Sequence, residues 1–230
     1  MVAAAVGSWR FAQRESRGYP RQPPPLALPE GQEALAHGAH FARTIAGCAQ
    51  CHGEDFGGQV MDGRSLLVMP SAHLRAISTT DMAAVIAFMR TLPPVDRQLG
   101  DSRVKPLGGI VLGLAGAPVL SAEEVLALPQ RAAAPAPGAT RAYGEYLAGV
   151  CRGCHGDDLR GGLTVHPGAP PSPDISAQAL ARWDFATFER ALRQGVARDG
   201  HVMGDGMPWR AFRGITAEEM RALWLGLRSN

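Results

Sequence analysis

The stretch Gly47-Cys48-Ala49-Gln50-Cys51-His52-Gly53 returns later in the chain as Cys151-Arg152-Gly153-Cys154-His155-Gly156. In Cys-x-x-Cys-His, the two cysteines lie about one helical turn apart, so both sulfurs can reach the vinyl carbons along one edge of a porphyrin. The histidine that follows can then give the iron one axial nitrogen. Two copies, each with its histidine in place, predict two covalently attached haem c groups. Their predicted ligands are Cys48, Cys51 and His52 for the first and Cys151, Cys154 and His155 for the second.

Two other uses of a Cys-x-x-Cys pair fit this sequence less well. A structural zinc ion usually needs four ligands, often from a second cysteine or histidine pair at fixed spacing. A redox dithiol is expected within a βαβ pattern, and the sequence contains none. All four cysteines lie in the two motifs, so none remains for a disulfide.

The composition fits a small helical protein built on haem. A chain of 230 residues suits one or two domains, at about 100–200 residues each. Its formal net charge of +2 argues against a nucleic-acid partner recognised through charge. Hydrophobic residues make up 46% and aromatic residues 6%, a balance that suits helical domains in which the porphyrin supplies much of the core.

The location follows from the haem motif, because bacteria attach haem c on the outer side of the inner membrane. The motif therefore predicts a periplasmic protein. Residues 1–30 are expected to form an extended N-terminal segment, with prolines stiffening residues 19–29. The apolar Met1–Val6 is too short for a signal peptide core of about 7–15 residues. It is consistent with the remnant of a signal anchor, and hence with inner-membrane association. No run of about 18 apolar residues predicts a membrane span.

The hydrophobic pattern predicts an all-α fold with two tandem small domains. The first, shortened, covers 31–95, a proline-rich linker covers 96–139, and the second covers 140–230. Helices are expected over 31–46, from Ser78 to Pro93, over 121–128, over 182–194, and from Thr216 to near the end of the chain. Ser78 and Thr216 are each expected to begin a capping box. Gly38 is expected to permit the close approach of another helix. The apolar stretch Ile110–Leu120 is expected to pack on one domain or between the two.

The internal repeat also suggests the second axial ligands. Met69 to Arg90 can be laid over Met207 to Arg228 without a gap, pairing Met69-Pro70 with Met207-Pro208. A methionine needed only for packing could be exchanged for leucine at little cost, so the repeated Met-Pro predicts Met69 and Met207 as thioether ligands. Met61 and Met203 are weaker candidates, and Met82, Met89 and Met220 are interpreted as core residues. Arg75, Arg213 and Trp209 are candidates for contact with the haem propionates.

The two halves are unequal in length. The first cysteines of the two motifs are 103 positions apart (48 and 151), whereas the two methionines are 138 apart (69 and 207). The first half therefore lacks 35 residues between its haem motif and its methionine. In the second half this interval contains the proline-rich loop 167–173 and the predicted helix 182–194.

From residues 31 to 228 the chain resembles the di-haem members of the bacterial class I cytochrome c family. The resemblance is carried by the two Cys-x-x-Cys-His-Gly motifs, by Asp62-Gly63-Arg64 before Met69-Pro70 and by Asp199-Gly200 before Met207-Pro208-Trp209. It implies that each domain wraps one haem between crossing N- and C-terminal helices. Members of that family are often membrane-anchored electron carriers or cytochrome subunits of periplasmic dehydrogenases.

These features predict one-electron transfer rather than substrate chemistry, because His/Met ligation leaves the iron no open position. The expected partners are a redox protein donor and acceptor, such as a dehydrogenase subunit or a terminal oxidase. The chain would then be a non-catalytic relay, or the electron-transfer subunit of a dehydrogenase. The alternative is a di-haem peroxidase-like enzyme, which would use an open coordination position on the shortened first haem site.

Overall fold

The structure, a computed structural model, describes residues 2–18, 26–58, 60–61, 64–65, 71–98, 104–115, 132–164, 170–204 and 206–229. The regular structure of these residues is helical, apart from one short antiparallel ladder between β1 (Val60–Met61) and β2 (Arg64–Ser65) and an isolated antiparallel bridge between Val196 and Val202. The all-α prediction is therefore confirmed for the described part of the chain. Met69 and the helix predicted at 121–128 lie outside the described residues.

The first haem motif belongs to a helical unit built from α2 (Gln32–His40), η1 (Phe41–Ile45), α3 (Cys48–His52) and α5 (Thr79–Met89). The helix predicted over 31–46 is present, although its end, η1, has π-helical geometry. A Cβ atom at Gly38 would collide with the carbonyl oxygen of Ala84, so α2 and α5 cross with their backbones in contact. Ser78 caps α5 as predicted, with its side chain accepting a hydrogen bond from the Asp81 backbone N–H.

The second helical unit repeats this arrangement with α8 (Arg141–Leu147), η2 (Ala148–Cys151), α9 (Arg152–His155) and α12 (Ala217–Leu227). A Cβ atom at Gly144 would collide with the Ala222 carbonyl oxygen, and these two residues are the counterparts of Gly38 and Ala84. Thr216 and Glu219 complete the predicted capping box at the start of α12. In each unit, the haem motif thus directly follows a helix that contains a glycine. The capped helix of the same unit crosses that helix at the glycine.

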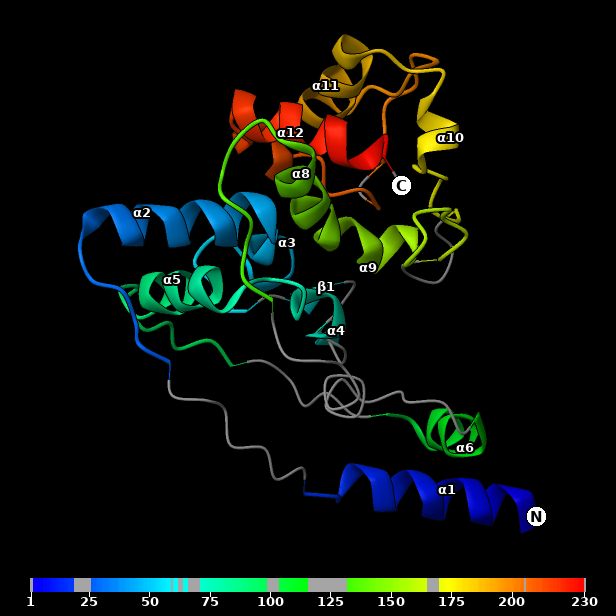
Figure 1. Cartoon of the computed structure of the whole chain (residues 1–230). Helices are drawn as coiled ribbons and strands as arrows, with labels where there is room; N and C mark the ends of the chain where they lie inside the picture. The colour runs from blue at the N-terminus through cyan, green and yellow to red at the C-terminus, as the bar shows by residue number, and fades with distance from the viewer. Residues whose placement is uncertain are drawn as a thin grey trace.

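The buried side chains of the two units form one continuous hydrophobic cluster. Leu147, Leu159 and Met220 are its largest fully buried members, which confirms Met220 as a core residue. Phe41, Ile45 and Ile77 join them from the first unit. Met89 was predicted to belong to the core, but its side chain is 37% exposed near the end of α5. Figure 1 shows α2 and α5 lying next to α8, α9 and α12.

Two helices of the second unit lie in the interval that the first half lacks. They are α10 (Ala177–Leu180) and α11 (Phe185–Gln194). The predicted helix over 182–194 starts later than expected, because Asp184 accepts a hydrogen bond from the Thr187 N–H and caps α11. Phe185 and Phe188 both pack against the Trp224 ring. The predicted apolar face of α11 therefore covers α12.

The N-terminal segment and the linker differ from the sequence prediction. Residues 1–30 were expected to be extended, but Val2–Glu15 forms the helix α1, favoured by its four alanines. The stretch Ile110–Leu120 was expected to pack on a domain or between two. Its described part belongs to helix α6 (Pro106–Ala115), which packs on α1. The two helices lie together, apart from the others (Figure 1). Among the described helices, none is long and apolar enough to cross a membrane.

Candidate functional site: two Cys-x-x-Cys-His helices

The two motifs fold in the same way, down to the turn that follows each histidine. Both helices end at a glycine with φ 80°, Gly53 after α3 and Gly156 after α9. Three residues later, Phe56 and Leu159 both adopt left-handed backbone angles, φ 56° and 61°, which a non-glycine residue rarely takes. The His52 carbonyl then accepts a hydrogen bond from the Gly58 N–H, at 2.8 Å, as the His155 carbonyl does from Gly161, at 2.7 Å. The sequence repeat is therefore a repeat of local structure.

The cysteines of both motifs lie in surroundings that disfavour the thiolate. Burial raises the pKa of the Cys48, Cys51 and Cys154 thiols, and it raises the pKa of Cys151 to about 12. A redox dithiol works through a thiolate whose pKa is lowered. These environments therefore argue against a redox dithiol at either motif.

His155 is held in the form that a metal requires. Its side chain is 5% exposed, and its Nδ1 lies 2.8 Å from the carbonyl oxygen of Pro173. Burial lowers the pKa of His155, partly opposed by this hydrogen bond, so the ring is neutral near pH 7. Because Nδ1–H donates to Pro173, the lone pair of Nε2 is left for an iron. The Cys-x-x-Cys-His motif identifies His155, but no pattern in the sequence points to the carbonyl that orients it.

The loop that carries Pro173 is attached to the second haem motif by a further hydrogen bond. The Ser172 hydroxyl donates to the carbonyl oxygen of Cys154, at 2.6 Å. In the first half, the His52 ring is half-buried, and it has no hydrogen-bond partner among the described residues. Pro173 belongs to the loop 167–173, which lies in the interval that the first half lacks.

The predicted distal side of the second site is built around Trp209. Met207 is half-buried, and its carbonyl oxygen accepts a hydrogen bond from the Trp209 N–H at 2.8 Å. The indole packs against Gly195, where a Cβ atom would lie 2.7 Å from Nε1. Arg213 lies over the ring, with its Cζ 4.6 Å from the ring centroid.

Trp209 gives the fit test for a haem at this site. Its Nε1 is buried and has no hydrogen-bond partner within the described structure. A buried donor without a partner costs about 1–3 kcal/mol, and a propionate carboxylate is an acceptor that would remove this cost. The second motif, the neutral His155 and the unpaired Trp209 together fit a covalent haem. Met69 lies outside the described residues, so the distal side of the first site stays a sequence prediction.

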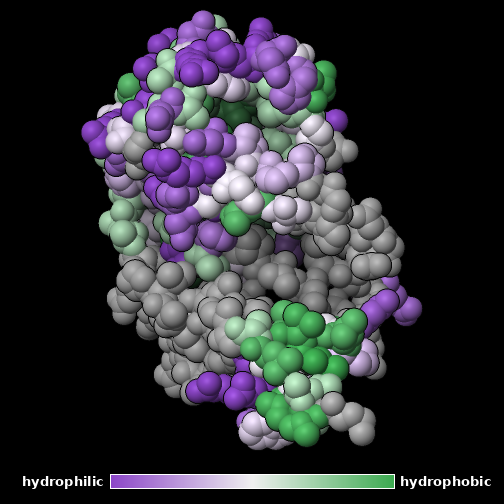
Figure 2. Space-filling model, turned by 90° about the vertical axis from the view of Figure 1, so that its right-hand side faces the viewer, coloured by the Kyte–Doolittle hydropathy of each residue, from purple (hydrophilic) through white to green (hydrophobic). Residues whose placement is uncertain are grey.

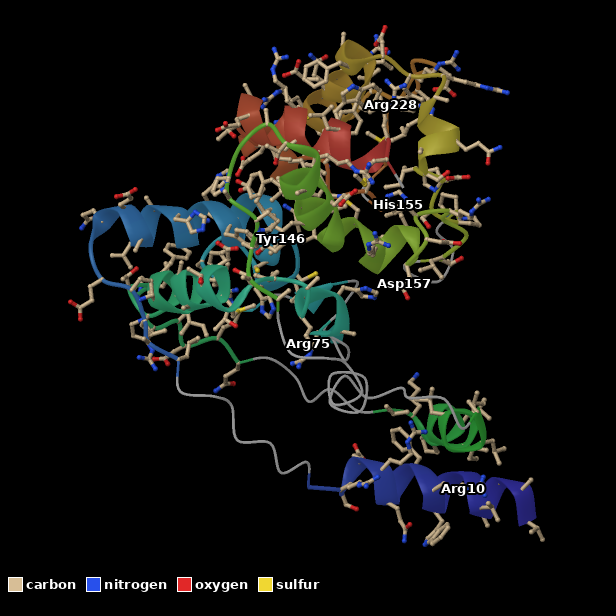
Figure 3. All side chains as sticks on the ribbon, in the orientation of Figure 1. Arg10, Arg75, Tyr146, His155, Asp157 and Arg228 are labelled. Atoms are coloured by element: carbon tan, nitrogen blue, oxygen red, sulfur yellow. The ribbon has the colours of Figure 1, made fainter. Side chains whose placement is uncertain are left out.

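The two units bind one another through reciprocal polar contacts. His40 of α2 places Nε2 2.9 Å from Oε1 of Glu219, the capping acid of α12. Tyr146 of α8 donates its hydroxyl to Asp81, the capping acid of α5. Figure 3 shows Tyr146 where α8 faces the first unit. In the repeat, His40 corresponds to Tyr146 and Asp81 to Glu219, so each unit makes the same contact to the other.

The haem motif of each unit also packs against the other unit. Gly47, just before α3, faces Ala211 in η3 (Ala211–Gly214), where its Cβ would lie 3.9 Å away. Gly153 within α9 faces the His73 ring in α4 (Ser71–Leu74), where its Cβ would lie 3.4 Å away. After burial, the charge of Cys51 is what raises the pKa of Cys154. The cysteines of the two motifs therefore lie within electrostatic reach of each other.

Several curated proteins share sequence with part of this chain. A nicotinate dehydrogenase subunit of Pseudomonas putida is 37% identical over 91 residues, 36% of this chain and 8% of that protein. The cytochrome c subunit of alcohol dehydrogenase (quinone) of Gluconacetobacter polyoxogenes is 34% identical over 92 residues, 35% of this chain and 20% of that protein. The gluconate 2-dehydrogenase cytochrome c subunit of Pantoea cypripedii is 32% identical over 94 residues, 35% of this chain and 21% of that protein.

Part of this chain is related to cytochrome c subunits of dehydrogenases. The matched part spans about a fifth or less of the length of these relatives. No family model matches the chain, and no solved structure matches it. The relationship supports the cytochrome c resemblance that the two motifs carry.

Proposed function

We propose that the chain is a di-haem c-type cytochrome of the bacterial periplasm that relays single electrons between redox partners. Each helical unit is then one cytochrome c domain with one covalent haem, and the proline-rich segment between them is a linker. The proximal ligands are His52 and His155, and the distal ligands are Met69 and Met207. A bound haem c supplies reversible one-electron oxidation and reduction at its iron.

The residues around the second site support this role, since they orient ligands and exclude water. Pro173 fixes the orientation of the His155 ring, which keeps the reorganisation on electron transfer small. Phe185 and Phe188 cover α12 with apolar surface. An apolar surrounding disfavours the extra charge of ferric iron and raises the potential.

The single observation that carries the relay is the reciprocal packing of the two motifs. Gly47 and Gly153 each lie against the other unit, and Cys51 is close enough for its charge to raise the pKa of Cys154. Two haems attached at these cysteines would be close neighbours. An electron received at one could then pass to the other within the same chain.

The relatives support a dehydrogenase as the electron donor. Two of the three are described as the cytochrome c subunit of a dehydrogenase, one for alcohol and one for gluconate. We propose that this chain likewise accepts electrons from a dehydrogenase and does not itself transform a substrate. A second redox protein, such as a terminal oxidase, would accept the electrons.

Electron-transfer kinetics test the relay. The haem-loaded protein is reduced by a small donor and mixed with an oxidised acceptor cytochrome, and both haems are followed by their α-band absorbance. The wild type should deliver two electrons per chain, and variants lacking one motif (Cys48→Ala/Cys51→Ala or Cys151→Ala/Cys154→Ala) should deliver one. Rapid peroxide-driven oxidation of a reduced donor by the wild type, lost in a His52 variant, would contradict the proposal and favour the peroxidase-like alternative.

A further inference from the structure

Helices α1 and α6 form a hairpin that no haem site requires. Its contact surface includes three glycines, Gly7, Gly109 and Gly113, and the Phe11 ring. A Cβ atom at Gly7 would lie 2.6 Å from the Ile110 carbonyl oxygen, and one at Gly113 would collide with the Gly7 carbonyl oxygen. Phe11 packs on Gly109. The two backbones are therefore in contact, which leaves the larger apolar side chains pointing outward.

The outward side chains of this hairpin are apolar to an extent unusual for a surface in water. α6 reads Pro-Leu-Gly-Gly-Ile-Val-Leu-Gly-Leu-Ala and has no polar side chain. A helix that is hydrophobic all round is normally covered by protein or lipid. Here the large apolar side chains are exposed: Val2 79%, Val6 37%, Trp9 58%, Leu107 73%, Val111 57% and Leu114 45%. Figure 2 shows strongly hydrophobic surface, in green, over both helices.

The charges on the hairpin indicate what kind of surface would cover its exposed apolar side chains. Its described residues, 2–18 and 104–115, contain the cations Arg10, Arg14, Arg17 and Lys105, against one carboxylate, Glu15. The Arg14 side chain donates to the Leu112 carbonyl oxygen at 3.3 Å, across the two helices. Arg10 and Lys105 are exposed, and Arg10 lies on α1, far from the haem motifs (Figure 3). An apolar face bordered by cations and an exposed tryptophan is the pattern of helices that lie in an anionic lipid surface.

We propose that the α1–α6 hairpin docks this protein on the surface of an anionic phospholipid membrane. The side chains of Val6, Trp9, Leu107, Val111 and Leu114 enter the boundary between headgroups and acyl chains, and Arg10 and Lys105 bind lipid phosphates. The glycine contact suits this setting, because helices in lipid associate through small residues and close backbone packing. Docking holds the haem units near the membrane without occupying either motif. This inference does not depend on the identity of the redox partners.

Vesicle binding tests the proposal with the full haem-loaded protein. Vesicles of phosphatidylcholine alone are compared with vesicles of phosphatidylcholine and phosphatidylglycerol in equal parts, and bound protein is separated by flotation. The wild type should bind the anionic vesicles, and added salt should weaken the binding because it screens the cations. Leu107→Asn/Leu114→Asn should lose about tenfold or more in affinity. Arg10→Gln/Lys105→Gln should lose most of the preference for anionic lipid.

Matched controls separate docking from misfolding. Leu225 on α12 is exposed to the same extent as Leu114, 45% each. Leu225→Asn and Arg182→Gln should therefore bind vesicles as the wild type does, and every variant should keep its haem spectrum. The proposal is overturned if the wild type fails to bind anionic vesicles, or if Leu107→Asn/Leu114→Asn binds them equally well. It is also overturned if the hairpin variants leave lipid binding intact but abolish a dimer or the capture of a dehydrogenase subunit.

Discussion

Nε2 of His40, in α2, lies 2.9 Å from Oε1 of Glu219, a residue of α12 that is 179 positions further along the chain. Glu219 also accepts a hydrogen bond from the Thr216 N–H, at 2.8 Å, within its capping box. One carboxylate thus caps a helix of the second unit and binds a helix of the first. Asp81 plays the equivalent part in the first unit. It accepts a hydrogen bond from Ser78 within the cap of its own helix and another from Tyr146 of the second unit.

Removal of the Tyr146 hydroxyl should weaken the contact between the units. The hydroxyl donates a hydrogen bond to Asp81 and accepts one from the Ser78 N–H at 3.0 Å. Tyr146→Phe should lower the free energy of unfolding by about 1–3 kcal/mol, because a buried carboxylate and a backbone N–H each lose a partner. Tyr143→Phe is the control, since this neighbouring buried phenol has no hydrogen bond among the described residues. Urea denaturation measures both, and equal losses would argue against the reciprocal contact.

The contact should also be sensitive to acid. Burial raises the pKa of Glu219, but hydrogen bonds from His40 and the Thr216 N–H outweigh it, and the pKa lies below the usual 4.5. A carboxylate whose pKa is lowered by folding stabilises the protein above its unfolded pKa, and this stabilisation is lost as the pH falls through the folded pKa. Stability should therefore fall below about pH 4.5. Glu219→Gln should be less stable at neutral pH and should lose part of this acid dependence. An unchanged pH profile would contradict the assignment.

Local features were predictable from the sequence and long-range ones were not. The caps at Ser78 and Thr216, the Gly38 crossing and the Gly195 end of α11 depend on residues a few positions apart or on the chemistry of glycine. The α1–α6 hairpin pairs segments about a hundred residues apart, so no local pattern could predict it. The same holds for the Pro173 carbonyl beside His155 and for His40 beside Glu219. Every residue has a backbone carbonyl, so the sequence does not show which one will bind a histidine.

Met207 is predicted as the distal ligand of the second haem, next to the buried Trp209. Met207→Ala should lower the potential of that haem and abolish its Met-to-iron absorption band, because a thioether ligand raises the potential. Met203→Ala is the matched control, since Met203 is also half-buried and precedes Met207 in the same loop. Near-infrared absorbance and a redox titration give the two readouts. Loss of the band in Met203→Ala but not in Met207→Ala would transfer the ligand role to Met203.

The two haems should differ in exposure and in potential. The second unit has α10 and α11 in an interval that is 35 residues shorter in the first. The linker stretch that could have replaced them packs, in its described part, on α1. The first haem should therefore have the lower potential and bind carbon monoxide or cyanide more readily. Each haem is followed in a variant that lacks the other motif. Equal resistance to ligand and a single-step titration would refute the inequality.

Each Cys-x-x-Cys-His helix should carry one covalent haem, and the intact mass of the denatured protein measures how many haems are attached. The wild type should exceed its polypeptide mass by two haems. The variants Cys48→Ala/Cys51→Ala and Cys151→Ala/Cys154→Ala should each retain one haem, and their haem absorbance per chain should be half that of the wild type. Two haems retained in either variant, or one haem in the wild type, would contradict the account.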